Sequence, residues 1–278
     1  MVEPLWEAFA SPGPIYVHAD FGPWALPVEG GDILELDWHE DDFAIEPADL
    51  VAQIPASCPL EVVGASLAEV GLALPYGPMI GLPAPGESAA WSVAVAIGLD
   101  LPHRLESRYG SWRTWILGAR LMLADGTIAK SGSKVVKSVA GYDVHKLVVG
   151  ARGCLGVLLD VTVRVWPLAA IDLPDPSPSS PSRAGSVWVQ RTLATDFARA
   201  IESAGNRLLL ADREGATLWA DVAPGDSLPR YAHDFLIRSG CGADNLQVVD
   251  PVQVRLLRRA KDLLDPEHRL NRGCLGVV

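Results

Sequence analysis

The 278-residue sequence lacks the features that mark membrane and nucleic-acid-binding proteins. No apolar run reaches the roughly 20 residues that span a bilayer, and no basic region followed by an apolar one opens the chain. There is no run of basic residues, and the formal net charge of −11 repels phosphate backbones. We therefore expect a cytoplasmic protein that has no transmembrane segment and does not bind nucleic acid.

Metal-binding and catalytic patterns are also missing. Cys58, Cys154, Cys241 and Cys274 are widely spaced and form no C-x-x-C pair, so neither a zinc knuckle nor an iron–sulfur site is indicated. The six histidines are isolated from one another, and a lone histidine is more often a surface or core residue than a base. We assign no metal ligand and no catalytic residue.

What the sequence does contain is a glycine-rich stretch at residues 138–157. Gly150, Gly153 and Gly156 recur at three-residue spacing between a short helix-like run and a long apolar segment. Glycine tolerates positive φ and allows close approach, so the turn is expected to lie against a ligand or a second backbone. A dinucleotide-binding G-x-G-x-x-G has the opposite order, because it follows a strand and opens a helix. A helix cap at Gly150 followed by ordinary turn residues remains an alternative.

Hydrophobic periodicity divides the first part of the chain into short strands and helices. The predicted strands cover residues 14–18, 33–38, 49–54, 115–123 and 157–165. Helices are predicted at 60–71, with Gly71 as a cap, and at 88–98, where small apolar residues suit a tightly buried helix. The segment Ala124-Asp-Gly-Thr127 predicts a hairpin turn.

A segment rich in proline and serine, residues 172–186, predicts a linker between two domains. The elements predicted beyond it are strand 187–191, helix 195–204, strands 207–211 and 216–222, helix 228–239 and strand 246–249. This order, βαββαβ, is that of a ferredoxin-like unit. A final helix at 252–264 is expected to pack back on the first domain.

Several ordered motifs resemble a known family. They are Val139-Ala-Gly-Tyr-Asp143 with the glycine turn after it, Tyr109-Gly-Ser-Trp-Arg-Thr-Trp-Ile-Leu-Gly118, and Leu264-Asp-Pro266 with Leu270-Asn271. Together they resemble FAD-linked oxidases of the vanillyl-alcohol oxidase and p-cresol methylhydroxylase (PCMH) type, in particular the FAD-binding accessory (E) subunit of bacterial glycolate oxidase.

The resemblance implies an α+β fold with a two-part PCMH-type FAD-binding domain at 1–170, a linker at 171–186, a small ferredoxin-like cap at 187–250 and a C-terminal return at 251–278. The glycine turn would face the adenine end of FAD. The residues that the resemblance places at the cofactor are Gly86, Ser92, Tyr109, Gly110, Ala140, Gly141, Tyr142, Asp143, Gly150, Gly153, Leu155, Gly156, Val157 and Asn271. Packing against the core is an alternative for Tyr142, and capping of the following helix by its side chain is the preferred role of Asp143.

The sequence differs from the family pattern at the positions that would contact the flavin cofactor. The glycine-rich diphosphate loop corresponds to His18-Ala-Asp-Phe-Gly22, which keeps one glycine and looks degenerate, and Asp20 would set a carboxylate near two phosphates. A family Gly-Gly pair aligns with Ser92 and Val93, and a terminal Asn-Pro-Gly reads Asn271-Arg-Gly273.

Two functions are compatible with these residues. One is an FAD-binding subunit of a glycolate-oxidase-like 2-hydroxy-acid dehydrogenase, which holds flavin for hydride or electron transfer and works with a catalytic flavin subunit and an iron–sulfur subunit. The other is a cofactor-free scaffold subunit derived from the same fold. No His-x-Gly-Asp-Gly-Asn motif is present, so we expect the chain not to oxidise glycolate or D-lactate alone. A peripheral association with the inner membrane through partners stays open.

Overall fold

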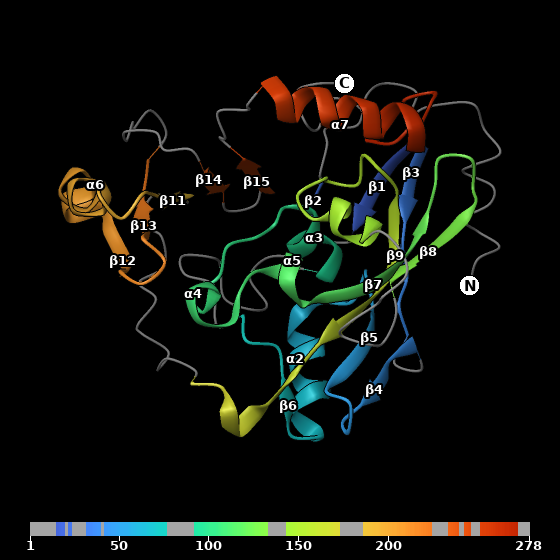
Figure 1. The fold of residues 1–278 in the computed structure, drawn as a ribbon, viewed down its shortest axis with the longest axis horizontal. Coiled ribbons are helices and arrows are strands. Elements are labelled where there is room, and N and C mark those ends of the chain that lie inside the picture. Colours follow the sequence, from blue (N-terminus) through green and yellow to red (C-terminus); the bar gives the residue numbers. More distant parts are fainter. Residues whose placement is uncertain are drawn as a thin grey trace.

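The computed structural model describes residues 15–19, 22–23, 32–39, 42–76, 92–132, 143–172, 186–223, 233–238, 242–245 and 251–271 (Figure 1). Its first part is built on a five-stranded antiparallel sheet in the order β4-β5-β9-β7-β8. These strands are β4 (Ala44–Glu46), β5 (Val51–Pro55), β9 (Val157–Arg164), β7 (Ile116–Met122) and β8 (Ile128–Gly132). The central strand, β9, is the longest of the described strands, as the sequence predicts.

Helices α2 (Leu60–Glu69), α3 (Val93–Gly98) and α5 (Trp112–Trp115) pack against one face of this sheet (Figure 1). In α2 the buried residues Leu60, Val63 and Leu67 recur at helical spacing and join the same apolar cluster as β5 and β9. Gly71, at φ 71°, follows this helix, so the predicted helix and its glycine end are confirmed. The smaller elements of this part are α4 (Glu106–Tyr109), the 3₁₀ turns η2 (Val144–Val148) and η3 (Leu168–Ala170), and the pair β6 (Leu72–Ala73) and β10 (Trp166–Pro167).

The hairpin between β7 and β8 forms where the sequence predicts a turn. The Asp125 carboxylate accepts a hydrogen bond from the Thr127 backbone N–H at 2.8 Å, and Leu123 N–H donates to the Thr127 carbonyl at 2.9 Å. Gly126 has φ 82°, a conformation that most side chains disfavour. The short polar turn therefore fixes the register of both strands.

A second, smaller sheet joins the two ends of the described chain. It has the order β2-β1-β3, with β1 (Ile15–Ala19) parallel to β3 (Asp32–Glu35) and antiparallel to β2 (Gly22–Pro23). Leu270, beyond helix α7 (Pro251–Leu264), forms a parallel bridge with Ile15. A separate apolar cluster contains Ile15, Leu34, Leu36, Met122, Ala124, Val157 and Leu270. The beginning, middle and end of the chain therefore share one small core.

The second part of the chain forms a five-stranded antiparallel sheet in the order β12-β13-β11-β14-β15. Its elements are β11 (Ser186–Arg191), α6 (Phe197–Ala204), the 3₁₀ turn η4 (Gly205–Arg207), β12 (Leu208–Asp212), β13 (Thr217–Asp221), β14 (His233–Arg238) and β15 (Gly242–Asn245). The first four predicted elements, strand, helix, strand and strand, are confirmed.

The predicted second helix is wrong for residues 233–238, which form β14 and pair with β11 along its whole length. The apolar core of β14, Phe235-Leu-Ile237, is too short for periodicity to separate a helix from a strand, and pairing with β11 decides the outcome. The ferredoxin-like βαββαβ order is therefore not confirmed. The strand predicted at 246–249 and most of the predicted linker lie outside the described residues, and the domain boundaries stay predictions.

The two parts are in direct contact. Arg191 on β11 forms an ion pair of 2.7 Å with Glu106 on α4, and Arg108 lies 3.5 Å from Glu214. Val187, Val189 and Trp219 belong to the same apolar cluster as the first sheet. Within the part of the chain that the structure describes, no helix combines the length and apolar character needed to cross a membrane.

Candidate functional site

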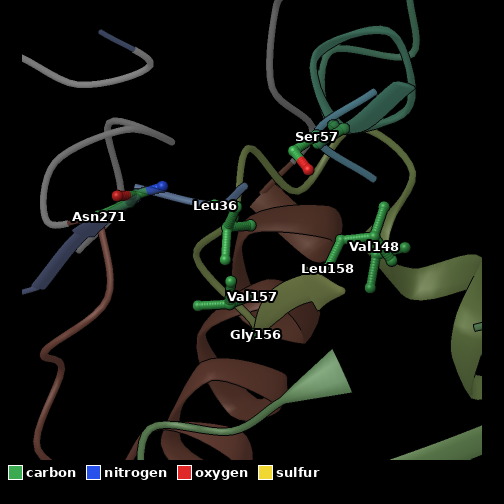
Figure 2. Close-up of a pocket in the computed structure, with 10 residues that line it drawn as sticks. Leu36, Ser57, Val148, Gly156, Val157, Leu158 and Asn271 are labelled. Carbon is green, nitrogen blue, oxygen red and sulfur yellow. The ribbon is translucent and has the colours of Figure 1, made fainter. Parts of the chain in front are cut away.

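The glycine turn lines a small pocket on the first part of the chain, and most of the residues around it are buried (Figure 2). The lining residues are Leu36, Ser57, Ala94, Gly98, Val148, Gly153, Gly156, Val157, Leu158 and Asn271. They come from segments that are far apart in the sequence, from Leu36, directly after β3, to Asn271, beyond α7. Apolar walls with a few polar groups at the edge are typical of small-molecule sites.

The turn reaches this pocket because it is fixed to the end of α3. Gly150 N–H donates to the Ile97 carbonyl at 3.0 Å, and Arg152 N–H donates to the Gly98 carbonyl at 3.0 Å. Gly150 and Gly153 have φ values of 79° and 71°, where a side chain would be strained. The second backbone that the sequence interpretation allows is present, because Gly150 bonds to Ile97. Gly153 and Gly156 line the pocket, and a ligand at the turn stays a prediction.

The C-terminal segment holds the other side of the turn. The Asn271 side-chain amide donates to the Arg152 carbonyl at 2.8 Å, and Asn271 N–H donates to the Ile15 carbonyl at 2.9 Å. The Lys261 ammonium donates to the Cys154 carbonyl at 2.7 Å and to the Leu270 carbonyl at 2.8 Å. The turn is therefore bonded to the segment that follows α7.

Lys261 is also ion-paired with Asp265, and both side chains are buried. Asp265 accepts further hydrogen bonds from Arg269 N–H at 2.9 Å and Leu270 N–H at 2.8 Å. A buried charge is tolerated when it is paired and hydrogen-bonded in this way. Sequence reasoning missed this pair, although its four-residue spacing at the end of a predicted helix was a usable signal.

The structure brings four of the residues implied by the resemblance into the pocket: Gly153, Gly156, Val157 and Asn271. Leu155 is instead buried at 1% exposure. Ser92 is fully buried and caps α3, because its hydroxyl accepts a hydrogen bond from Val95 N–H at 3.2 Å. Gly86, Ala140, Gly141 and Tyr142 lie outside the described residues. The pocket residues that the sequence did not indicate are Leu36, Ser57, Ala94, Gly98, Val148 and Leu158.

Tyr109 and Gly110 do not line this pocket. The Tyr109 hydroxyl donates to the Ala170 carbonyl at 3.3 Å and accepts from Asp172 N–H at 3.2 Å. Gly110 has φ 83°, and a Cβ there would lie 2.3 Å from the Thr114 hydroxyl oxygen. The structure therefore shows local folding roles for both residues.

The predicted capping role of Asp143 is wrong. Its side chain makes no capping hydrogen bond to η2 and pairs with the Lys146 ammonium at 2.8 Å. The hydrogen bond from Lys146 lowers the pKa of the Asp143 carboxyl. The N–H groups that a cap would accept from are already bonded, because His145 N–H donates to the Ser131 hydroxyl at 3.1 Å and Lys146 N–H donates to the Asp143 carbonyl at 2.9 Å.

The buried histidines have the properties of neutral structural groups. Burial lowers the pKa of His103 to about 3, and its Nε2 lies 3.1 Å from the Gly110 carbonyl. Burial also lowers the pKa of His145, whose Nδ1 lies 3.1 Å from the Ser131 hydroxyl. Neither residue lines the pocket. Among the residues that the structure describes, no group of three or more His, Cys, Asp and Glu side chains could hold a metal ion.

The predicted diphosphate loop is described only in part. Ala19 at the end of β1 pairs with Gly22 at the start of β2, and His18 pairs with Pro23. Asp20 and Phe21 lie outside the described residues. The degenerate character of this loop therefore stays a prediction from the sequence.

No protein-family model matches the chain. In sequence, the chain is related to FAD-linked oxidoreductases, as its motifs predict. Glycolate oxidase subunit GlcE of Escherichia coli (strain K12) is 38% identical over 137 residues, which are 49% of this chain and 37% of that protein. Glycolate oxidase subunit GlcD of Bacillus subtilis (strain 168) is 29% identical over 142 residues, or 51% of this chain and 28% of that protein. The chain thus matches less than two fifths of the length of either relative.

Structure comparison finds alkyldihydroxyacetonephosphate synthase, with a TM-score of 0.47 and 12% sequence identity. The match covers 73% of this chain and 34% of the synthase.

Proposed function

We propose that the chain binds FAD at the pocket beside the glycine turn and serves as an FAD-binding subunit of a glycolate-oxidase-like 2-hydroxy-acid dehydrogenase. The observation that carries this proposal is the convergence of Gly153, Gly156 and Asn271 on one pocket. The resemblance assigns all three to the cofactor, although Asn271 lies after α7, far from the two glycines in the sequence. The relatedness to glycolate oxidase subunits supports the same assignment.

The chemistry of the pocket residues supports the adenine end of the cofactor as the part that binds here. Leu36, Val157 and Leu158 supply apolar surface for a flat ring, and the glycines allow the backbone to lie close to it. Ser57 and Asn271 supply polar groups at the edge (Figure 2). Bound FAD would supply the hydride and electron chemistry, while these side chains bind it and exclude water.

The chain is expected to depend on partner subunits for substrate oxidation. None of the described histidines lines the pocket, and a 2-hydroxy acid needs a group that takes its hydroxyl proton. We propose that a catalytic flavin subunit supplies this chemistry and that an iron–sulfur subunit takes the electrons onward. GlcE and GlcD are both named as subunits of glycolate oxidase, which supports a role in an assembly.

A cofactor-free scaffold is the second candidate. It is favoured by the small size of the pocket, because Val157 and Asn271 line it although they are only 0% and 1% exposed. In that case the pocket would be a remnant, and the chain would act only in assembly with the partner subunits.

Flavin analysis of the purified full-length chain separates the two candidates. We expect yellow protein that releases FAD on denaturation, or colourless protein that binds added FAD in a fluorescence titration. Protein that neither carries FAD nor takes it up would contradict the cofactor function and leave the scaffold. Turnover of glycolate or D-lactate by the isolated chain with an artificial electron acceptor would contradict the dependence on a catalytic subunit.

A further inference from the structure

Helix α7 exposes an apolar line of side chains to solvent. Val252 is 48% exposed, Leu256 58% and Leu263 81%. With Arg259 they occupy positions i, i+4, i+7 and i+11, which follow one face of a helix. The opposite face is anchored, because Lys261 is buried and bonded to the glycine turn. In Figure 1 this helix lies at the edge of the molecule.

The exposed face of α7 is also basic, in contrast to the chain as a whole. Arg255, Arg258 and Arg259 are exposed, whereas the exposed acidic residue on the described part of this face, Asp262, is paired with His268 at 2.9 Å. The whole sequence has a formal net charge of −11. An apolar line that includes Arg259, with Arg255 and Arg258 beside it, is thus set into an acidic protein.

We infer that this face of α7 is a docking surface for a different protein subunit, one that offers an apolar groove with carboxylates along its rim. This inference rests on the proposed function, in which the partner is the catalytic flavin subunit. Leu256 and Leu263 would enter the groove as anchors, and Arg255 and Arg259 would meet the acidic rim.

Charge and composition argue against two other occupants, a second copy docked through the same face and a membrane surface. A second copy of the chain, docked through the same face, would bring its own arginines against these, and like charges oppose such pairing. A membrane surface would take apolar and aromatic side chains on one face, but this line contains no aromatic residue and is interrupted by Arg259. An anionic bilayer would also repel the remainder of the acidic chain.

The location gives the surface a functional consequence. On the buried side of α7, Lys261 donates a hydrogen bond to the Cys154 carbonyl in the glycine turn. A helix with its side chains is about 10 Å across. A subunit docked on the outer face would therefore lie about one helix diameter from the turn that lines the proposed FAD pocket. None of the residues that line the pocket belongs to α7, so a subunit docked on this helix would not contact them through it.

The test measures binding of the purified full-length chain to the catalytic flavin subunit of the same host's glycolate oxidase, by biolayer interferometry. We expect Leu263→Asp and Arg259→Glu each to weaken binding at least tenfold, and Arg259→Glu to reduce its salt dependence. The matched control is Leu193→Asp in the second part of the chain, since Leu193 is 71% exposed and lies far from α7 in the sequence. We expect this control to bind like the wild type.

Equal binding by Leu263→Asp and the wild type, or no binding by the wild type, would overturn the inference. It would also be overturned if Leu263→Asp left subunit binding unchanged and instead abolished self-association in light scattering or sedimentation with anionic vesicles. FAD titration is run in parallel on the wild type and Leu263→Asp. A chain that fails to take up FAD but binds the subunit through α7 contradicts the cofactor function alone, whereas one that binds FAD but not the subunit contradicts the docking surface alone.

Discussion

The Lys261 ammonium on α7 donates a 2.7 Å hydrogen bond to the backbone carbonyl of Cys154 in the glycine turn. Both ends of this contact are buried. Because Lys261 also binds Asp265 and the Leu270 carbonyl, one charged side chain joins the turn, the helix and the segment that pairs with Ile15. The shape of the candidate pocket therefore depends on a residue that does not line it.

Replacing Lys261 with methionine should destabilise the protein strongly. The substitution leaves the buried Asp265 carboxylate without its cation and the Cys154 carbonyl without this donor, and breaking a buried pair typically costs about 3–5 kcal/mol. Urea unfolding measures the change in the free energy of unfolding. Arg255→Met, on the exposed face of the same helix, is the control and should stay within about 0.5 kcal/mol of the wild type. A Lys261→Met protein as stable as this control would show that the contact is dispensable.

Substitutions at two glycines with the same φ distinguish the effect of backbone strain from an effect on cofactor binding. Gly153 in the turn and Gly71 after α2 both have φ 71°, so alanine at either position should cost about 1–2 kcal/mol of stability. Gly153 lines the pocket, while Gly71 does not. Gly153→Ala should therefore weaken FAD binding at least tenfold in a fluorescence titration, and Gly71→Ala should leave it unchanged. Equal FAD affinity in the two variants would argue against a cofactor at this turn.

His103 should make stability depend on pH below neutrality. Burial lowers its pKa from 6.5 to about 3, partly opposed by the Gly110 carbonyl. The unfolded chain binds the proton between these values, so the stabilising effect is complete above pH 6.5 and declines as the pH falls toward 3. Between pH 7 and pH 5 this loss should be about 2 kcal/mol.

Urea unfolding of the wild type and of His103→Asn at both pH values isolates this loss, because the other titrating groups are common to the two proteins. We expect the difference between the pH values to shrink by about 2 kcal/mol in the variant. The exposed His39, changed to asparagine, provides a control that should retain the wild-type difference. An unchanged difference in His103→Asn would rule out His103 as its source.

The ion pair between Asp160, on the central strand, and Arg120 should contribute to the stability of the protein. The buried Asp160 carboxylate accepts from the Gln53 amide at 2.9 Å and is ion-paired with Arg120. Arg120→Ala removes the cation and should cost about 1–3 kcal/mol. Lys130 is the exposed cross-strand neighbour of Arg120, so Lys130→Ala removes a like charge and should cost nothing. A larger decrease in the free energy of unfolding for Lys130→Ala than for Arg120→Ala would contradict a stabilising role of the Arg120–Asp160 pair.

The sequence predicts those features that local chemistry determines. The helix before Gly71, the turn between β7 and β8 and the central strand β9 each combine a clear period with a glycine or polar boundary. The glycine turn could be located because three glycines at regular spacing indicate a backbone that another surface approaches closely. Its partner surface, the end of α3, could not be derived, because the bonds to Ile97 and Gly98 join distant segments.

The remaining features depend on packing between distant segments. Residues 233–238 form a strand because they pair with β11. The Asp143 side chain pairs with Lys146 and makes no capping hydrogen bond to η2. Leu36 and Ser57 lie in no sequence motif, yet the tertiary fold places them at the pocket. Sequence spacing does not predict contacts between distant segments. For Asn271 the family resemblance supplies this information.

The bridge between Ile15 and Leu270 has a consequence for the synthesis of the protein. A chain that grows from its N-terminus makes β1 and β3 before the rest of the site, and the residue that completes the pocket beside them, Asn271, is made only after α7. Contacts of such large sequence separation form late and slowly. The candidate site cannot be completed on the nascent chain before α7 has been made, so a flavin that binds there must enter after translation has passed this helix.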